Sequence, residues 1–197
     1  MPAQRKPAAS TDGRINRSLL TRRKIVDALT ALIHQGFVTP TAEQVAQRAH
    51  VGLRTVFRHF DDMDSLYREI SQDLDGQVLP LTQVRLAGTT WLDRLLHTVD
   101  LRRDIYDRVA AIHLAAQVHR HESAFLTQNL MESAAMQRQL IRSLLPEAAA
   151  REPGLLDALD VALSLESWVR LRREQGLTAA AAVAVMKRTA RALLAGC

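Results

Sequence analysis

The stretch TAEQVAQRAHVGLRTVFRHF, residues 41–60, decides the fold of this chain. Thr41, with Gln44 three residues later, forms a capping box, which predicts that a short helix begins there. The apolar residues that give this helix its predicted buried side are Val45, Ala46 and Ala49. Residues His50–Gly52 interrupt the pattern, and a second short helix is predicted over Leu53–His59. Two short helices joined by such a turn are typical of a helix-turn-helix motif.

A longer helix is predicted before this motif, from Ser18 to about Gln35. Its apolar residues stand at i, i+4, i+7 and i+8, which places them on one helix face: Ile25, Leu29, Leu32 and Ile33. Gly36 is the predicted C-terminal stop. Residues 1–17 have no apolar period, so we predict that they form a disordered arm. The basic side chains of this arm are Arg5, Lys6, Arg14 and Arg17.

The second short helix of the motif combines an apolar side with outward basic chemistry. Val56 and Phe60 are predicted to face inward. The residues then free to face outward are Arg54, Thr55, Arg58 and His59. An α-helix fits the major groove of B-DNA, and an arginine can hold guanine O6 and N7 together. The alternative that this spacing leaves open is an ordinary helical corner whose basic residues are only solvated.

Charge is distributed unevenly along the 197 residues. Residues 1–60 contain ten Lys or Arg against three acids, a net charge of +7, whereas residues 61–197 contain 16 basic and 18 acidic residues, a net charge of −2. A basic front of this kind favours a polyanionic partner. The lone cysteine, Cys197, leaves no disulfide within one chain. Because the sequence contains neither a secretory signal nor a run of about 18 apolar residues, we expect a cytoplasmic protein.

The remainder of the chain has helical periodicity and no strand-like alternation, so the whole chain is predicted to be all-α. A fourth helix is predicted from Asp62, and further helical segments near 89–99, 101–118, 122–145, 155–174 and 178–195. No glycine-rich phosphate loop occurs, and the carboxylates have no nucleophile partner. The three histidines of the central region do not share a helix face: His113, His119 and His121. The sequence therefore predicts no cofactor, no metal site and no catalytic residue.

Residues 41–70 resemble the DNA-binding signature of the TetR family, the tetracycline-repressor-like regulators. The matching positions are Thr41, Val45, Ala46, Ala49, Val51, Thr55, Val56, Phe60 and Leu66. Three positions depart from the pattern: His50 replaces the usual glycine of the turn, Phe57 the usual tyrosine, and Met63 the usual lysine. The last two changes remove side chains that contact phosphate, and the two aspartates before Met63 would repel it.

The resemblance implies an all-α protein with an N-terminal three-helix helix-turn-helix DNA-binding domain joined to a larger helical ligand-binding and dimerisation domain. Here that division gives a basic disordered arm over 1–17, a DNA-binding domain over 18–61, and an effector-binding and dimerisation domain over 62–197. It implies a repressor that binds a palindromic operator as a homodimer and is released by a small molecule. The residues implied to contact DNA are Thr41, Leu53, Arg54, Thr55, Phe57, Arg58 and His59, with Arg14 and Arg17 of the arm.

For the larger domain, the resemblance implies a pocket for a small apolar or aromatic effector, and a dimer interface on the helices near 155–174 and 178–195. The pocket candidates combine apolar area with a polar or polarizable atom: Trp91, Leu95, Tyr106, His113, Phe125, Gln128, Met131 and Trp168. The interface candidates are Leu156, Leu159, Leu163, Val169, Val183, Ala190 and Leu194. Two alternatives stay open, a helical enzyme and a protein-interaction module without sequence-specific DNA binding.

Overall fold

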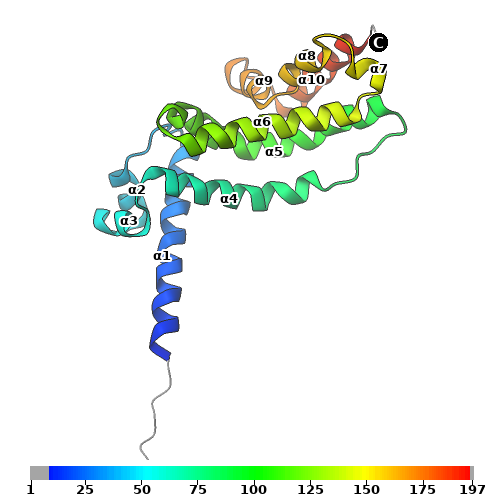
Figure 1. Ribbon diagram of the computed structural model, residues 1–197. Coiled ribbons are helices and arrows are strands. Elements are labelled where there is room, and N and C mark those ends of the chain that lie inside the picture. Colours follow the sequence, from blue (N-terminus) through cyan, green and yellow to red (C-terminus); the bar gives the residue numbers. More distant parts are fainter. Residues whose placement is uncertain (1–8, 196–197) are drawn as a thin grey trace, which may run out of the picture. The chain divides into compact units, whose positions relative to one another are not determined.

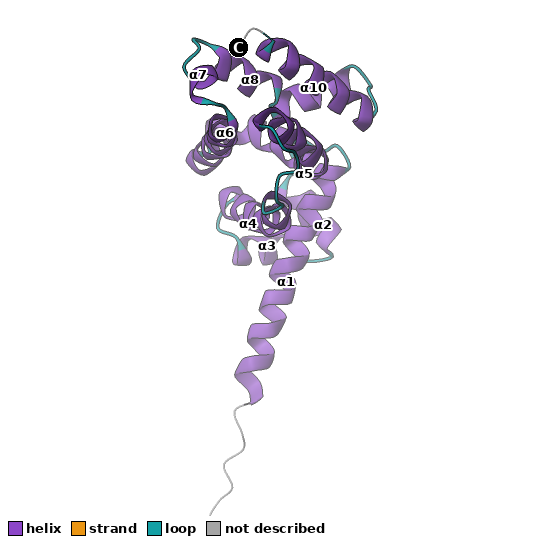
Figure 2. Cartoon of the chain, turned by 90° about the vertical axis from the view of Figure 1, so that its right-hand side faces the viewer, coloured by secondary structure: helices purple, strands orange, loops and turns teal. Residues whose placement is uncertain are grey.

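The computed structural model describes residues 9–195, and every regular element in that range is helical. Ten α-helices, one 3-10 turn and one π-helical turn follow one another, and the described residues contain no strand (Figures 1 and 2). The all-α prediction is therefore confirmed. The chain divides into two compact units, an N-terminal unit that ends at Ile70 and a C-terminal unit that begins at Ser71. None of the described helices is long and apolar enough to cross a membrane.

Four helices build the N-terminal unit: α1 (Ala9–His34), α2 (Ala42–Ala49), α3 (Leu53–His59) and the first part of α4 (Met63–Thr82). α2 packs against both α1 and α3. The core contains the predicted faces of all three helices, buried together: Ile25, Leu29, Leu32, Ile33, Val45, Ala46, Ala49, Val56 and Phe60. The sequence-based prediction of the helix-turn-helix core is confirmed.

α1 begins earlier than the sequence predicted. Residues 9–17, which we assigned to a disordered arm, are helical, and residues 1–8 of that arm lie outside the described range. The prediction was wrong for 9–17 because a helix extends at low cost once a packed segment has fixed its nucleus, and no proline interrupts α1. The side chains of residues 13–20 are all exposed, so this part of α1 extends beyond the core to which the helix is anchored.

Left-handed residues end both α1 and α2. Gly36, the predicted stop of α1, has a φ of 97°. At the end of α2, the Val51 N–H donates to the Ala46 carbonyl at 3.0 Å, and His50 between them has a φ of 55°. Gly52 does not take this role, because at a φ of −73° it is the extended N-cap of α3. His50 therefore holds a conformation that a Cβ atom disfavours by roughly 1–2 kcal/mol.

One side chain of α1, Arg22, joins three parts of the N-terminal unit. Its Nη1 donates to the carbonyl oxygen of His59 at 2.6 Å, where α3 ends. Its Nε and Nη2 lie 2.9 Å and 2.7 Å from Oε1 of Glu69 on α4. Its guanidinium carbon also lies 4.2 Å from the centroid of the Phe60 ring. Arg22 therefore holds the end of α3 against α1 and α4 at once.

The C-terminal unit contains the rest of α4 and six further α-helices. They are α5 (Trp91–His119), α6 (Ala124–Leu144), α7 (Glu147–Ala150), α8 (Leu155–Ala162), α9 (Leu165–Val169) and α10 (Ala179–Leu194), with the 3-10 turn η1 (Arg120–Glu122) and the π-helical turn η2 (Arg170–Glu174) between them. α5 packs against α6 and α10, and α8 packs against the same two helices. Its core is built from leucines of α5 and α8 and from small and apolar residues of α10, together with Trp168.

α5 replaces the two predicted helices 89–99 and 101–118. It continues through Asp100 and Arg102 because no glycine or proline interrupts it, and both side chains have distant partners. Asp100 Oδ1 lies 2.6 Å from Nζ of Lys187 on α10. Arg102 is buried, and its Nη1 donates to the carbonyl oxygen at position 163 at 3.1 Å. The helical pattern of this segment was predicted correctly, but the break predicted between the two helices does not occur.

The predicted helix 155–174 is instead divided into α8, α9 and η2. Ser164 causes the break, because its Oγ accepts the N–H of Ser167 at 3.1 Å and caps α9. Several residues assigned to the dimer interface are buried within the chain itself: Leu156, Leu159, Leu163, Ala190 and Leu194. That assignment was wrong, because these side chains form the core of their own unit. Val169 and Val183 are half-buried.

We predict that Arg22→Ala lowers the free energy of unfolding by about 1–3 kcal/mol, because the His59 carbonyl and the Glu69 carboxylate both lose a charged donor. Arg22→Lys should recover little of this, since an ammonium group cannot bridge both acceptors as a planar guanidinium does. Denaturant titration gives the measurement.

Arg23→Ala is the matched control. Arg23 is exposed and pairs with Asp27 within α1 at 3.0 Å, so its loss should cost about 0.3–0.5 kcal/mol. Equal losses for the Arg22 and Arg23 variants would contradict the bridging role of Arg22.

Candidate nucleic-acid interface

α3 has one buried and one exposed face. Val56 is 3% exposed, and Phe60 at the end of the helix is buried to the same extent. The exposed residues stand at i, i+1, i+4 and i+5, and so share one side of the helix: Leu53, Arg54, Phe57 and Arg58. This division lets the outer side of α3 meet a partner without disturbing the packing of the inner side.

The exposed face of α3 carries two guanidinium groups and one aromatic ring. Arg54 and Arg58 lie one helical turn apart, and Phe57 between them is 53% exposed. Phe57 has no hydroxyl group to donate to a phosphate. Its ring can instead make the apolar contact with a thymine methyl group that major-groove readers use.

His59 adds no positive charge to this face. Burial lowers the pKa of His59, and the charges of Arg58 and Arg22 lower it further. The imidazole is therefore neutral at pH 7, where it can exchange hydrogen bonds but cannot neutralise a phosphate. The formal charges of α3 are those of Arg54 and Arg58.

Two threonines stand at the starts of the motif helices. The Gln44 N–H donates to Thr41 Oγ1 at 3.3 Å, and the Thr41 N–H donates to Gln44 Oε1 at 2.9 Å, which confirms the predicted capping box. Thr55 lies in the first turn of α3, half-buried, and its N–H donates to the Gly52 carbonyl at 2.8 Å. Both hydroxyl groups are therefore placed at helix N-terminal turns, where backbone N–H groups favour an anion.

Arg14 and Arg17, predicted to lie in a flexible arm, are held on the exposed first turns of α1. The Nε of Arg17 donates to the carbonyl of Gly13 at 3.0 Å. Residues three and four positions apart share a helix side, so Arg14 and Arg17 continue through Thr21 to Lys24 as a single stripe along α1. The helix fixes the spacing of these side chains, which a disordered arm would not do.

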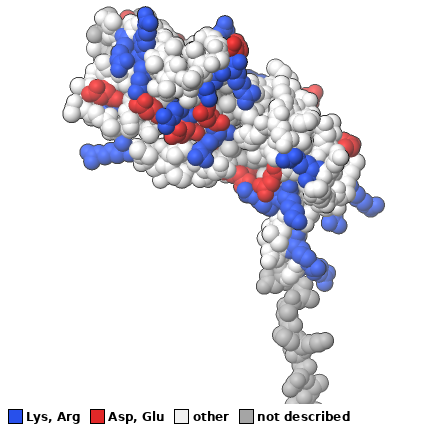
Figure 3. All heavy atoms as spheres, turned by 180° about the vertical axis from the view of Figure 1, so that it is seen from behind, with Lys and Arg blue, Asp and Glu red and all other residues white. Residues whose placement is uncertain are grey.

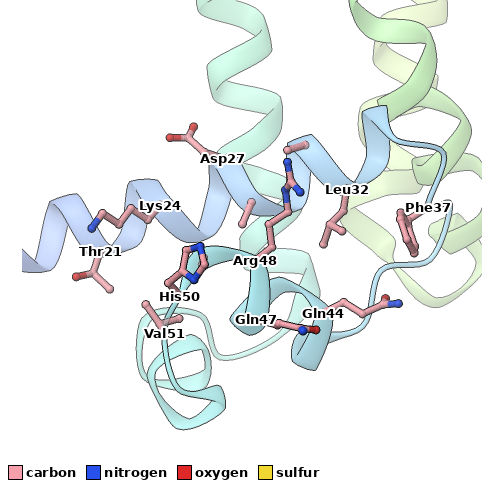
Figure 4. Close-up of a pocket in the computed structure, with 13 residues that line it drawn as sticks. Thr21, Lys24, Asp27, Leu32, Phe37, Gln44, Gln47, Arg48, His50 and Val51 are labelled. Carbon is pink, nitrogen blue, oxygen red and sulfur yellow. The ribbon is translucent and has the colours of Figure 1, made fainter.

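The stripe leads into a groove between α1 and α2, which we call the α1–α2 groove. Its volume is about 870 Å³, and Figure 4 shows Thr21 and Lys24 toward one end, Phe37 at the other, and Arg48 extending between the two helices. The residues that line it are Thr21, Lys24, Asp27, Ala28, Ala31, Leu32, Phe37, Gln44, Gln47, Arg48, Ala49, His50 and Val51. Sequence reasoning missed this groove, although the spacing of Arg14, Arg17 and Lys24 was a signal for it.

Charged residues of both signs flank α3. His50 and Val51, which precede α3, line the α1–α2 groove with its cations. Asp61 and Asp62 follow α3, both exposed, and the Asp62 carboxylate accepts the Ser65 N–H at 2.8 Å at the start of α4. In Figure 3, Lys and Arg side chains project from the extending stem of α1. The exposed carboxylates therefore follow a last turn of α3 that is itself basic, because it contains Arg58.

The eight residues predicted to form an effector pocket fall into two groups. A buried group belongs to the core of the C-terminal unit: Leu95, Tyr106 and Trp168, with the partly buried Trp91 packed against it. An outer group includes Met131, which is exposed on α6, and Gln128, whose Nε2 donates to Glu132 at 2.6 Å. Phe125 and His113 are half-buried.

Polar contacts tie α5 to α8 and α9 around the buried group. The Tyr106 hydroxyl donates to the Leu163 carbonyl at 2.8 Å and also contacts Gln137. His113 Nε2 lies 3.0 Å from Oε1 of Glu166, and this hydrogen bond is the main reason that the pKa of Glu166 falls to about 2. These contacts use the polar atoms of Tyr106 and His113 within the protein.

Trp168 lines a hollow of about 230 Å³ beside η2. Its Nε1 donates to Oδ1 of Asp107 at 3.2 Å, and the guanidinium carbon of Arg172 lies 5.7 Å from its ring centroid. This volume is smaller than the roughly 300–1,000 Å³ of drug-sized ligand pockets. Among the described residues, no group of three His, Cys, Asp or Glu is placed to hold a metal ion.

Comparison with known proteins agrees with this geometry. Residues 25–70 match the sequence model of a family described as bacterial regulatory proteins, tetR family. A search of curated protein sequences finds no significant match. Among solved structures, a transcriptional regulator from Rhodococcus sp. Rha1 has the same fold, with a TM-score of 0.70 and 16% sequence identity. The similarity covers 89% of this chain and 96% of that one.

Proposed function

We propose that this chain, a DNA-binding transcriptional regulator of the tetR family, is a homodimeric repressor that a small molecule releases from a palindromic operator. The observation that carries the proposal is the exposed face of α3, where two arginines and an aromatic ring stand opposite the buried Val56. Membership in a family of regulators argues against the enzyme alternative. It also argues against an interaction module without DNA binding.

In this proposal the outer side of α3 enters the major groove. Arg54 is the second residue of α3, and the N-terminal part of a recognition helix approaches base edges. Arg54 therefore reads guanine, with Arg58 as the second reader one turn further on. The remaining proposed DNA contacts are Leu53, Thr55, Phe57 and His59 of α3, Thr41 at the start of α2, and Arg14 and Arg17 of α1.

We predict that Arg54→Ala costs roughly 1–3 kcal/mol of binding free energy on the preferred operator and much less on random duplex, because a bidentate guanine contact is lost. Operators selected from random duplexes supply the specific site, and titrations with both duplexes give the measurement. Arg85→Gln is a charge control, because Arg85 is exposed in the C-terminal unit and forms no ion pair with a described residue. Equal weakening of both duplexes by Arg54→Ala would make Arg54 a phosphate contact and shift base reading to Arg58.

The outer sides of α8 and α10 support a dimer interface. These helices pack on each other, and each leaves apolar area uncovered. Val161 of α8 is 69% exposed, and Val185 of α10 is 39% exposed. Ala184 and Ala192 of α10 are also exposed, so a second copy can approach this side closely. A dimer is needed because palindromic half-sites are read about 34–36 Å apart by two recognition helices.

Light scattering at micromolar concentration should give a mass near twice the 22.0 kDa of the chain. Val161→Glu should shift the protein toward monomer, because it places a carboxylate in an apolar interface, and should weaken operator binding. Val84→Glu is the matched control, since Val84 is exposed outside α8 and α10. A Val161→Glu protein that stays dimeric would contradict this interface, and a wild-type monomer that binds a palindrome tightly would contradict the dimer.

The exposed apolar side chains of α6 support an effector site. Met131, Met136 and Leu140 are exposed on this helix, and large exposed apolar side chains often mark binding surfaces. Methionines adapt to ligands of irregular shape. The chemistry that fits is a small apolar or aromatic compound, and its binding must favour a conformation with lower operator affinity.

A compound of this class should raise the melting temperature and weaken operator binding together, because linkage between two sites is reciprocal. Such a compound can be identified by a screen that measures the melting temperature of the protein, with Trp168 fluorescence as a second signal. Met131→Gln should reduce the stabilisation and leave operator affinity without compound unchanged. A compound that stabilises the protein but leaves operator affinity unchanged would contradict the proposed release.

A further inference from the structure

The α1–α2 groove contains positive charge that the contacts within the protein do not neutralise. Lys24 and Arg48 line it, and neither forms an ion pair with a described residue. The nearest partner of Arg48 is an uncharged amide, since its Nη1 lies 3.5 Å from Oε1 of Gln35. The carboxylate that lines the groove, Asp27, is already paired with Arg23 at 3.0 Å. The groove therefore presents a net positive charge to whatever occupies it.

The remaining lining residues combine hydrogen-bonding groups with apolar side chains, about half of which are alanines. Gln44, Gln47 and Thr21 add uncharged hydrogen-bonding groups around the two cations, His50 adds an imidazole, and alanines form much of the apolar part of the lining. Small apolar residues beside spaced donors let a sugar–phosphate chain approach closely. Phosphate and sugar contacts of this kind come from lysine, arginine, threonine and glutamine in DNA complexes.

The position of the groove along the chain identifies which DNA would reach it. His50 and Val51 line the groove, and Leu53 and Arg54 follow within three residues at the start of α3. A duplex that places its bases at the start of α3 therefore has its flanking backbone next to the groove. The other end of α3 carries Arg58 and is followed by the exposed carboxylates of Asp61 and Asp62. The stripe of Arg14 and Arg17 extends the same positive path along α1.

We propose that the α1–α2 groove binds the phosphate backbone that flanks the bases contacted by α3, with Lys24 and Arg48 as its charged contacts. The proposal rests on the DNA-binding function proposed above and adds a second DNA contact surface to it. Phosphate contacts in this groove replace the ones that Phe57 and Met63 cannot make near the end of α3, because neither side chain has a group that binds phosphate. In this proposal, the additional phosphate contacts lie near the start of α3.

The test uses Lys24→Gln, Arg48→Gln and the double variant in the full chain, with Arg85→Gln as the control for loss of one charge elsewhere. Salt titrations with operator and with random duplex give the slope of log affinity against log salt. Each single variant should reduce the steepness of that slope by up to about 0.9, and the double variant by up to about 1.8. Both duplexes should be weakened by the same factor, because phosphate contacts carry no base information.

Phosphate ethylation interference gives an independent readout. Ethylation of phosphates flanking the bases read by α3 should weaken binding of the wild-type protein and have no effect on the double variant. Melting temperatures show whether each variant is folded. Lys24→Gln keeps the experiment decisive if Arg48→Gln is unstable, because Lys24 has no hydrogen-bond or ion-pair partner among the described residues.

A double variant with wild-type slope on both duplexes would overturn the groove proposal, and so would a loss confined to the operator. The proposed function would survive either result as long as Arg54→Ala still reduced specificity. A wild-type protein that selects no sequence from random duplexes would instead overturn the proposed function itself.

Discussion

The placement of α3 depends on the guanidinium group of Arg22. α3 has seven residues and buries one of them, Val56, so it cannot be stable as an isolated helix. Its end is held by the burial of Phe60 and by Arg22, which contacts that ring, the carbonyl of His59 and the carboxylate of Glu69. α3 therefore takes its orientation from α2, against which it packs, and from the contacts that Arg22 of α1 makes with its end, and not from its own sequence preferences. A side chain that looks from the sequence like one more cation for DNA is instead part of the scaffold.

α4 takes part in this constraint. The helix runs from Met63 to Thr82, whereas the N-terminal unit ends at Ile70, so α4 contributes residues to both units. Glu69, which holds Arg22, lies immediately before that boundary. The last residues of α4 within the N-terminal unit therefore hold the end of α3 through Arg22.

The features that could be predicted from sequence are those that short-range patterns encode. The capping box of Thr41 and Gln44 and the apolar spacing of α1 are local, and the structure contains both. The contact between Asp100 of α5 and Lys187 could not be predicted, because 87 residues separate the two side chains. The interface assignment failed for a different reason. Apolar periodicity predicts that residues such as Leu159 are buried, but it cannot indicate whether the same chain or a second copy covers them.

The net charge of residues 1–60 also shows what the sequence alone cannot predict about the candidate site. The +7 of residues 1–60 indicates a polyanionic partner but not which cations meet it. Arg22 is held by the scaffold and Arg23 is paired with Asp27, whereas Lys24 and Arg48 line an open groove. Arg58 in the last turn of α3 is exposed, and the exposed carboxylates of Asp61 and Asp62 follow it. A count of charges along the sequence cannot separate these roles, because they depend on which side chains the fold pairs with one another and which it leaves facing a partner.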